Sequence, residues 1–246
     1  MIRNTLIILV SLLGFSLYAQ SEVSHKPFDE ILQKYVNEEG MVDYKGIKSE
    51  RSKLKNYLSH LEKNAPQNSW SDDQKLAFWI NAYNAYTIEL ILTHYPVASI
   101  KDIGSTIKIP FVSTAWDIKF INIGGEEYDL NNIEHGIIRK EFDEPRIHFA
   151  LVCAAVSCPK LQNNAYFPET LDEQLAKAAT DFLADPEKNE FKNAKKATLS
   201  KIFNWYGGDF NNEGTLIEYI NKYAPTKLER NARIDWKDYD WALNEQ

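Results

Sequence analysis

Apolar residues recur every three or four positions along most of this chain, which is the spacing of a helix with one buried face. The pattern predicts a first helix over residues 27–36 and a second over about 44–64. It predicts further helices at about 73–94, 130–141, 171–183 and 214–223. Helices therefore account for most of the predicted structure.

Strand-like segments are fewer. Residues 116–123 and 126–130 flank a Gly-Gly pair, which favours the tight turn of a hairpin. Residues 191–206 are typical of a strand followed by a helical turn, and 234–241 alternates enough to form another strand. The pattern as a whole predicts an α+β fold: a mostly helical single domain with a small antiparallel sheet.

The predicted helix at 73–94 differs from the others because it is apolar on every side. Such a helix usually lies at the centre of the core. Asn81 and Asn84 lie three residues apart on it, so they share a face and should be at least partly buried. Buried amides need hydrogen-bond partners. These two side chains either tie neighbouring loops together or orient a catalytic group.

The predicted helix at 130–141 places Glu134 inside its apolar face and His135 at the edge of that face. A carboxylate in such a position must be paired or have a raised pKa. Arg146 is a possible partner. Glu134 is therefore either half of a structural ion pair or a catalytic group.

The first residues are typical of an export signal. Arg3 supplies a positive start, residues 6–17 are apolar, and a cleavage point follows Ala19. We therefore predict a signal peptide at 1–19 and a single globular domain at 20–246. The mature protein would be periplasmic or secreted, with no stable membrane span after cleavage.

The charge balance limits the partners. The chain carries 28 basic and 35 acidic residues, a net charge of −7, and loss of Arg3 with the signal would leave a net charge of −8. An acidic protein is poorly suited to bind nucleic acid or an anionic membrane. We expect a peptide or glycan ligand instead, and the sequence does not indicate an oligomeric state.

Both cysteines lie in residues 146–159, where an apolar run ends at a polar turn. Catalysis by a thiolate needs a base beside it and a group that orients the base. Cys158 is the candidate nucleophile, since it lies in the turn. The candidate bases are His148 and His135, and the candidate orienting groups are Asn81, Asn84 and Glu134.

A structural disulfide between Cys153 and Cys158 is the competing interpretation, since an exported protein meets oxidising conditions. In one continuous helix the two side chains would lie about 140° apart and could not bond. A turn near Ala155 would let them meet. The cysteines and histidines match no standard zinc spacing, so we predict neither a metal nor a cofactor.

Aromatic residues offer a binding surface as a further possibility. The chain has 6 Trp and 13 Tyr, with clusters at Trp205-Tyr206 and 236–241. Exposed rings can stack on sugars or peptides, although most rings in a protein of this size pack in the core. The candidate binding residues are Trp205, Tyr206, Arg146 and Cys153.

Several long motifs follow one another in order, at 77–85 (AFWINAYNA), 133–139 (IEHGIIR), 145–153 (PRIHFALVC), 157–159 (SCP), 202–206 (IFNWY) with Asp209-Phe210, and 239–244 (YDWALN). On these motifs the chain resembles the domain of unknown function 547 family over roughly residues 27–246. The resemblance implies a domain that is exported in bacteria and also occurs in larger eukaryotic proteins, in some of them beside a glutaredoxin-like domain. That association favours a thiol or redox role, but the family implies no activity.

The favoured hypothesis is an exported, thiol-dependent hydrolase or transferase of the cell envelope that uses Cys158. The alternative is a non-catalytic peptide- or glycan-binding or scaffold module with a structural Cys153–Cys158 disulfide.

Overall fold

The computed structural model describes residues 23–104, 114–212 and 214–246. The predicted signal peptide at 1–19 lies outside the described residues. The α-helices are α1 (Lys26–Tyr35), α2 (Tyr44–Ser49), α3 (Arg51–Lys63), α4 (Asp72–His94), α5 (Arg139–Glu141), α6 (Leu171–Ala184), α7 (Ile202–Trp205), α8 (Gly207–Phe210) and α9 (Leu216–Tyr223). In the described part of the chain, no helix combines the length and apolar character needed to cross a bilayer.

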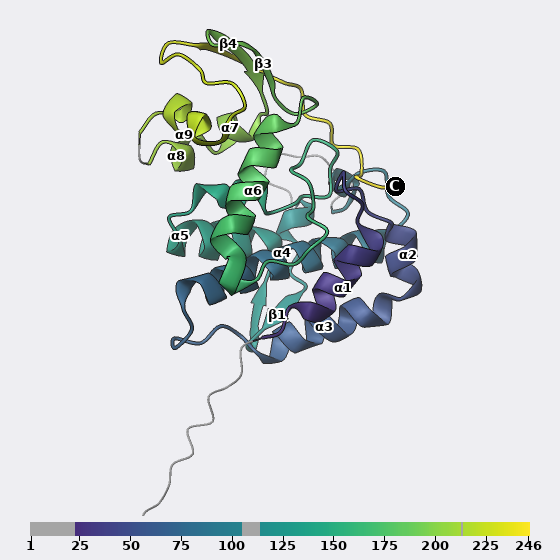
Figure 1. The fold of residues 1–246 in the computed structure, drawn as a ribbon. Helices are drawn as coiled ribbons and strands as arrows, with labels where there is room; N and C mark the ends of the chain where they lie inside the picture. Colours follow the sequence, from purple (N-terminus) through teal and green to yellow (C-terminus); the bar gives the residue numbers. More distant parts are fainter. Residues whose placement is uncertain (1–22, 105–113, 213) are drawn as a thin grey trace, which may run out of the picture.

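The strands form two small sheets. They are β1 (Ile121–Ile123), β2 (Glu126–Tyr128), β3 (Glu190–Asn193), β4 (Lys196–Leu199) and β5 (Arg233–Trp236). β1 and β2 make the predicted antiparallel hairpin, while β4 pairs antiparallel with β3 and parallel with β5. The sheet of β3 and β4 lies at one end of the molecule and β1 near the other (Figure 1). The predicted α+β class is confirmed.

Helix α4 is the central element, as its all-round apolar pattern predicts. Ser71 begins it with a capping box, in which the Ser71 side chain accepts from the Gln74 N–H and the Gln74 side chain accepts from the Ser71 N–H. Asn81 and Asn84 are both buried on it. In Figure 1, α4 runs through the middle of the molecule behind α6 and α1.

Two predicted helices differ from the structure. The helix expected over 44–64 is interrupted at Glu50, whose carboxylate accepts from Tyr35 and Lys53 at the junction of α2 and α3. The helix expected over 130–141 begins as the π-helix η3 (Asn132–Ile138), in which the Arg139 N–H bonds to the Glu134 carbonyl, five residues back. π-Turns often occur at functional sites.

Buried apolar residues form two clusters. The larger joins α1–α4 with the β1–β2 hairpin, and the smaller joins α6, β4 and α7–α9. Tyr239, in the C-terminal tail, packs against both clusters. The single domain predicted over residues 20–246 stays a prediction.

Candidate functional site

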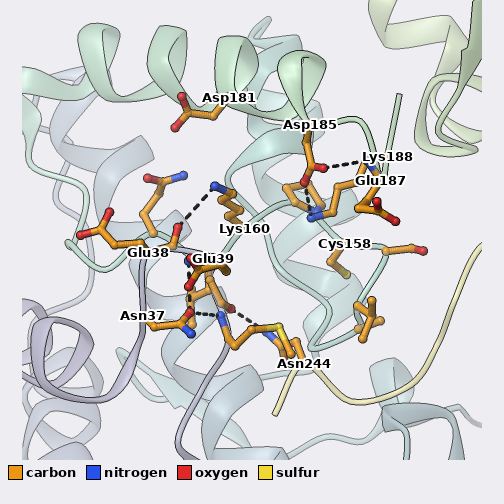
Figure 2. A pocket seen from close by; sticks show the side chains of 18 of the residues that line it. Asn37, Glu38, Glu39, Cys158, Lys160, Asp181, Asp185, Glu187, Lys188 and Asn244 are labelled. Atoms are coloured by element: carbon orange, nitrogen blue, oxygen red, sulfur yellow. Dashed lines mark hydrogen bonds and ion pairs between the residues drawn. The ribbon is translucent and has the colours of Figure 1, made fainter. Parts of the chain in front are cut away.

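Two cavities meet at Cys158 and Pro159, which line both. The large cavity, about 1140 Å³, is lined mostly by polar and charged side chains. Figure 2 shows Glu38 and Glu39 on one side of it and Asp181 and Asp185 of α6 on the other. The small cavity is about 310 Å³. Of the two, the small one contains most of the predicted site residues.

Cys153 and Cys158 form a disulfide, with an S–S distance of 2.01 Å and a Cα–Cα distance of 6.2 Å. The sequence left this open, and the structure has the disulfide rather than a free thiol. Cys158 therefore has no thiolate in this form of the protein, so the predicted nucleophile exists only after reduction. The Tyr239 hydroxyl donates to Cys158 Sγ at 3.2 Å and lies 3.4 Å from Cys153 Sγ.

The backbone turns sharply between the cysteines, which is what lets the two sulfurs meet. Ala154 has a φ of 56°, in the left-handed region that a non-glycine residue seldom occupies. The C-terminal tail holds this turn: Asn244 N–H donates to the Ala154 carbonyl, and Val156 N–H donates to the Ala242 carbonyl. The tail beyond Trp236 therefore braces the disulfide loop and does not extend β5 as predicted.

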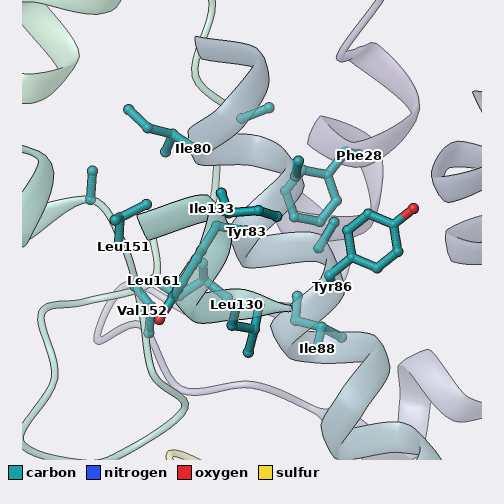
Figure 3. Packing of buried hydrophobic residues seen from close by; sticks show 14 of the residues in the cluster. Phe28, Ile80, Tyr83, Tyr86, Ile88, Leu130, Ile133, Leu151, Val152 and Leu161 are labelled. Atoms are coloured by element: carbon teal, nitrogen blue, oxygen red, sulfur yellow. The ribbon is translucent and has the colours of Figure 1, made fainter. Parts of the chain in front are cut away.

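The small cavity brings together seven of the ten predicted site residues, from segments far apart in the sequence. They are Glu134, His135, His148, Cys153, Cys158, Trp205 and Tyr206. Tyr83, Trp116, Tyr239 and Trp241 add further rings, and Asn131, Leu151, Pro159 and Ile202 complete the lining. Figure 3 shows Tyr83 within the core cluster that also contains Ile133 and Leu151.

Glu134 is the carboxylate of the small cavity. Its side chain is only 8% exposed, and its Oε1 accepts a hydrogen bond of 2.7 Å from the Tyr206 hydroxyl. Tyr83 also lines the cavity beside Glu134. Burial, and then the charge of Glu134, raise the pKa of both tyrosines. Both phenols therefore stay protonated at neutral pH, and the Tyr206 hydroxyl donates to the carboxylate.

A second polar chain runs behind Tyr206. The imidazole of buried His148 stacks on the Tyr206 ring, with centroids 3.9 Å apart, and its Nε2 donates to Asp209 Oδ2 at 2.7 Å. Arg139 binds both Asp209 oxygens, at 2.6 and 2.8 Å. Hydrogen bonds from His148 and then Arg139 hold the pKa of Asp209 well below its usual range.

His135 lies at the exposed edge of this network. Arg139 Nη1 donates to His135 Nδ1 at 3.1 Å. His135 Nδ1 also lies 3.8 Å from Glu134 Oε1. A ring nitrogen that accepts from arginine carries no proton of its own. The His135 nitrogen nearest Glu134 is therefore already engaged by Arg139.

Aromatic rings form the rim of the small cavity. Trp205 is 47% exposed and stacks on Trp241 at 6.0 Å, and Tyr239 packs against both. Trp116 makes an edge contact with Trp241 at 5.9 Å. An exposed ring supported by others offers a flat face to a ligand without a large loss of side-chain entropy.

The other predicted site residues lie outside both cavities. Asn81 pairs with the backbone of Tyr166, and Asn84 with the Ala150 carbonyl and the Val152 N–H. These bonds match the loop-tying interpretation. Arg146 as a partner of Glu134 is wrong: it pairs with Glu144 and Asp172, because the 3₁₀ turn η4 (Pro145–Phe149) aims it at the start of α6.

Sequence reasoning missed Asp209, Arg139 and Tyr239 as members of the site. Arg139 follows His135 by four residues, a spacing that brings helical side chains together, and Asp209 belongs to a motif quoted above. Nothing local in the sequence links Tyr239 to the cysteines. Among the described residues, no group of three or more His, Cys, Asp and Glu side chains could hold a metal ion.

Comparisons with known proteins agree with the resemblance seen in the sequence. The model of the family described as "Protein of unknown function, DUF547" matches residues 67–183, so this part of the chain is a domain of unknown function 547. No curated protein matches. No solved structure matches either.

Proposed function

We propose that this protein is a non-catalytic binding module whose small cavity takes a side chain of a peptide. The observation that supports this is the lining of the cavity, where aromatic rings surround one buried carboxylate, Glu134. Ligand sites are mostly apolar, with a few placed polar groups that set specificity. The disulfide also removes the free thiolate that the enzyme hypothesis requires.

A peptide fits this lining better than a glycan does. A sugar presents hydroxyls all round and needs many polar partners, whereas the polar side chains here, apart from the cysteines and phenols, are Asn131, Glu134, His135 and His148. His148 already donates to Asp209, and Asn131 donates to Asp117. The rings can bury the apolar stem of an amino acid side chain instead.

The test is a titration of the oxidised protein with short peptides and with cell-wall glycan fragments, followed by tryptophan fluorescence and calorimetry. We expect saturable peptide binding that Trp205→Ala weakens at least tenfold. Trp236→Ala is the matched control, because Trp236 is 36% exposed but does not line the cavity. Binding of glycan fragments alone, or equal binding by the two variants, would contradict the proposal.

Thiol catalysis is the second candidate function, because the Cys153–Cys158 disulfide, His148 and Glu134 line one cavity. It requires a reduced form of the protein. Turnover of a peptide or amide substrate that appears with reductant and is lost in Cys158→Ala would support it. Full turnover by the oxidised protein would exclude it.

We also propose that the protein is exported. The disulfide supports an oxidising compartment, and the predicted signal agrees with that. Cell fractionation with N-terminal mapping tests this: we expect a chain that begins at Gln20 outside the cytoplasm, and a chain that keeps its first residues in the cytoplasm would contradict it.

A further inference from the structure

Among the described residues, no cation pairs with the buried carboxylate of Glu134. In the described part of the chain, its one ion-pair contact is His135 Nδ1 at 3.8 Å, and that nitrogen accepts from Arg139. Arg139 is already bound to both oxygens of Asp209. Buried charges in proteins are normally paired. The hydrogen bond from Tyr206 stabilises the carboxylate but does not neutralise it.

The walls around Glu134 also favour a positive charge. The faces of Tyr and Trp rings attract cations, and six such rings line the cavity. The chain uses this property itself: the Arg139 guanidinium lies 5.1 Å from the centre of the Tyr206 ring, and Lys101 Nζ lies 4.9 Å from the centre of the Trp241 ring.

The charged groups next to Glu134 do not oppose the binding of a cation. Asp209 and Arg139 cancel each other, and His148 stays neutral because burial lowers its pKa against the opposing hydrogen bond to Asp209. Within this network Glu134 is thus left uncompensated, while Lys101 lies over the Trp241 ring at the rim. Because the Glu134 side chain is only 8% exposed, its attraction for a cation is stronger than that of a carboxylate at the surface.

We propose that the small cavity selects a cationic side chain, the ammonium of a lysine residue in a peptide, which Glu134 binds while the surrounding rings cover its apolar stem. This proposal rests on the proposed binding function and adds the chemical class of the ligand. A lysine stem is a flexible four-carbon chain with three ammonium donors. It can therefore bring both an apolar surface and a charge into one narrow site.

The test compares two tripeptide amides, acetyl-Ala-Lys-Ala and acetyl-Ala-norleucine-Ala, which differ at the end of one side chain. Calorimetry on the oxidised protein should give at least tenfold tighter binding of the lysine peptide. Glu134→Gln should remove that preference by weakening lysine binding at least tenfold and leaving norleucine binding within twofold. Glu126→Gln, an exposed change in the β1–β2 hairpin, is the matched control and should change neither.

The outcomes distinguish the selection of a cation from the proposed peptide binding on which it rests. If both peptides bind equally to the wild-type protein and Trp205→Ala weakens both, the binding function stands and the selection of a cation fails. If neither binds, both proposals fail. The wild-type ratio decides even if Glu134→Gln does not fold. A glucosamine disaccharide that binds through Glu134 when the lysine peptide does not would overturn the choice of a peptide.

Discussion

The large cavity, about 1140 Å³, is lined by several carboxylates, whereas the small cavity, about 310 Å³, is lined by a single buried one, Glu134. The carboxylates at the end of α6 and just after it already have partners, since Lys177 pairs with Asp181 and Lys188 with Asp185. The first pair lies near the surface, where water and salt screen it; the second is mostly buried, and each partner neutralises the other. Glu134 is only 8% exposed and has no such partner among the described residues.

Size is therefore a poor guide to the site in this molecule. The larger cavity offers more room, but its charges are solvated or neutralised, so a ligand gains little by replacing water there. The smaller offers rings and one placed charge, so a ligand of the right chemistry gains from each contact. Substitutions on one side of the disulfide loop should therefore show which cavity binds the peptide.

The largest effect is expected from the two amides of α4. Asn84→Ala leaves the Ala150 carbonyl and the Val152 N–H without partners, and an unsatisfied buried group costs about 1–3 kcal/mol. The free energy of unfolding should fall by roughly 4 kcal/mol, measured by urea denaturation. The substitution also loosens the segment just before Cys153, so peptide binding to the small cavity should weaken.

Asn81→Ala is the matched variant, because Asn81 makes the same pair of bonds to Tyr166. Tyr166 does not line the small cavity. We expect a similar loss of unfolding free energy and, in the folded fraction, unchanged binding. If both variants weakened peptide binding equally, the bonds of Asn84 next to the small cavity would matter no more for binding than those of Asn81, which lie away from it.

Reduction of the disulfide comes next. The sequence separation of its cysteines is 5, and closing so short a loop stabilises a protein by about 2 kcal/mol. Reduced protein should lose that amount in urea denaturation and should bind peptide more weakly, since Cys158 divides the two cavities. A Cys153→Ala, Cys158→Ala protein should not respond to reductant. If it does, the effect belongs to another part of the chain.

Buried His148 predicts how stability depends on pH. Burial lowers the pKa of His148, partly opposed by the Asp209 hydrogen bond and the charge of Glu134, while Arg139 lowers it further. As pH falls below about 6.5, the unfolded chain binds a proton that the folded protein does not, so the free energy of unfolding falls. Each such histidine contributes at most about 1.4 kcal/mol per pH unit.

His148→Gln should make that decline less steep between about pH 6.5 and 5, as read from denaturation midpoints. His25→Gln should do the same, because burial, with a smaller contribution from His60, lowers the pKa of His25 to about 4. His25 lines neither cavity. Only His148→Gln should alter peptide binding. If His25→Gln altered it too, the effect on binding would come from lower overall stability and not from the cavity.

The fold was largely predictable because its signals are local. The all-round apolar pattern of α4, the cap at Ser71 and the Gly-Gly turn between β1 and β2 each depend on neighbours in the sequence. The π-turn at 132–138 and the break at Glu50 could not be predicted from the sequence, since each depends on a bond that competes with the regular helix. Sequence patterns average over such bonds.

The site was predictable as a set of residues but not as an arrangement. Periodicity placed Glu134 on a buried face, and composition singled out Trp205. The partners of these residues lie far away in the sequence: Tyr206 reaches Glu134 across 72 positions and Tyr239 reaches Cys158 across 81. Spacing cannot reveal such contacts, which is why Arg146 was given the wrong partner.

The smallest effect is expected from the exposed carboxylates of the large cavity. Glu38 and Glu39 face water near Lys160, whose Nζ donates to the Glu38 carbonyl rather than to a carboxylate. The double change Glu38→Gln, Glu39→Gln should alter the free energy of unfolding by less than about 0.5 kcal/mol and lysine-peptide affinity by less than about twofold. It removes two negative charges from the molecule, whereas Glu134→Gln removes one. If charge at a distance drew the peptide in, the double variant would lose more affinity at low salt. If the buried carboxylate binds the ammonium, Glu134→Gln loses more at every salt concentration.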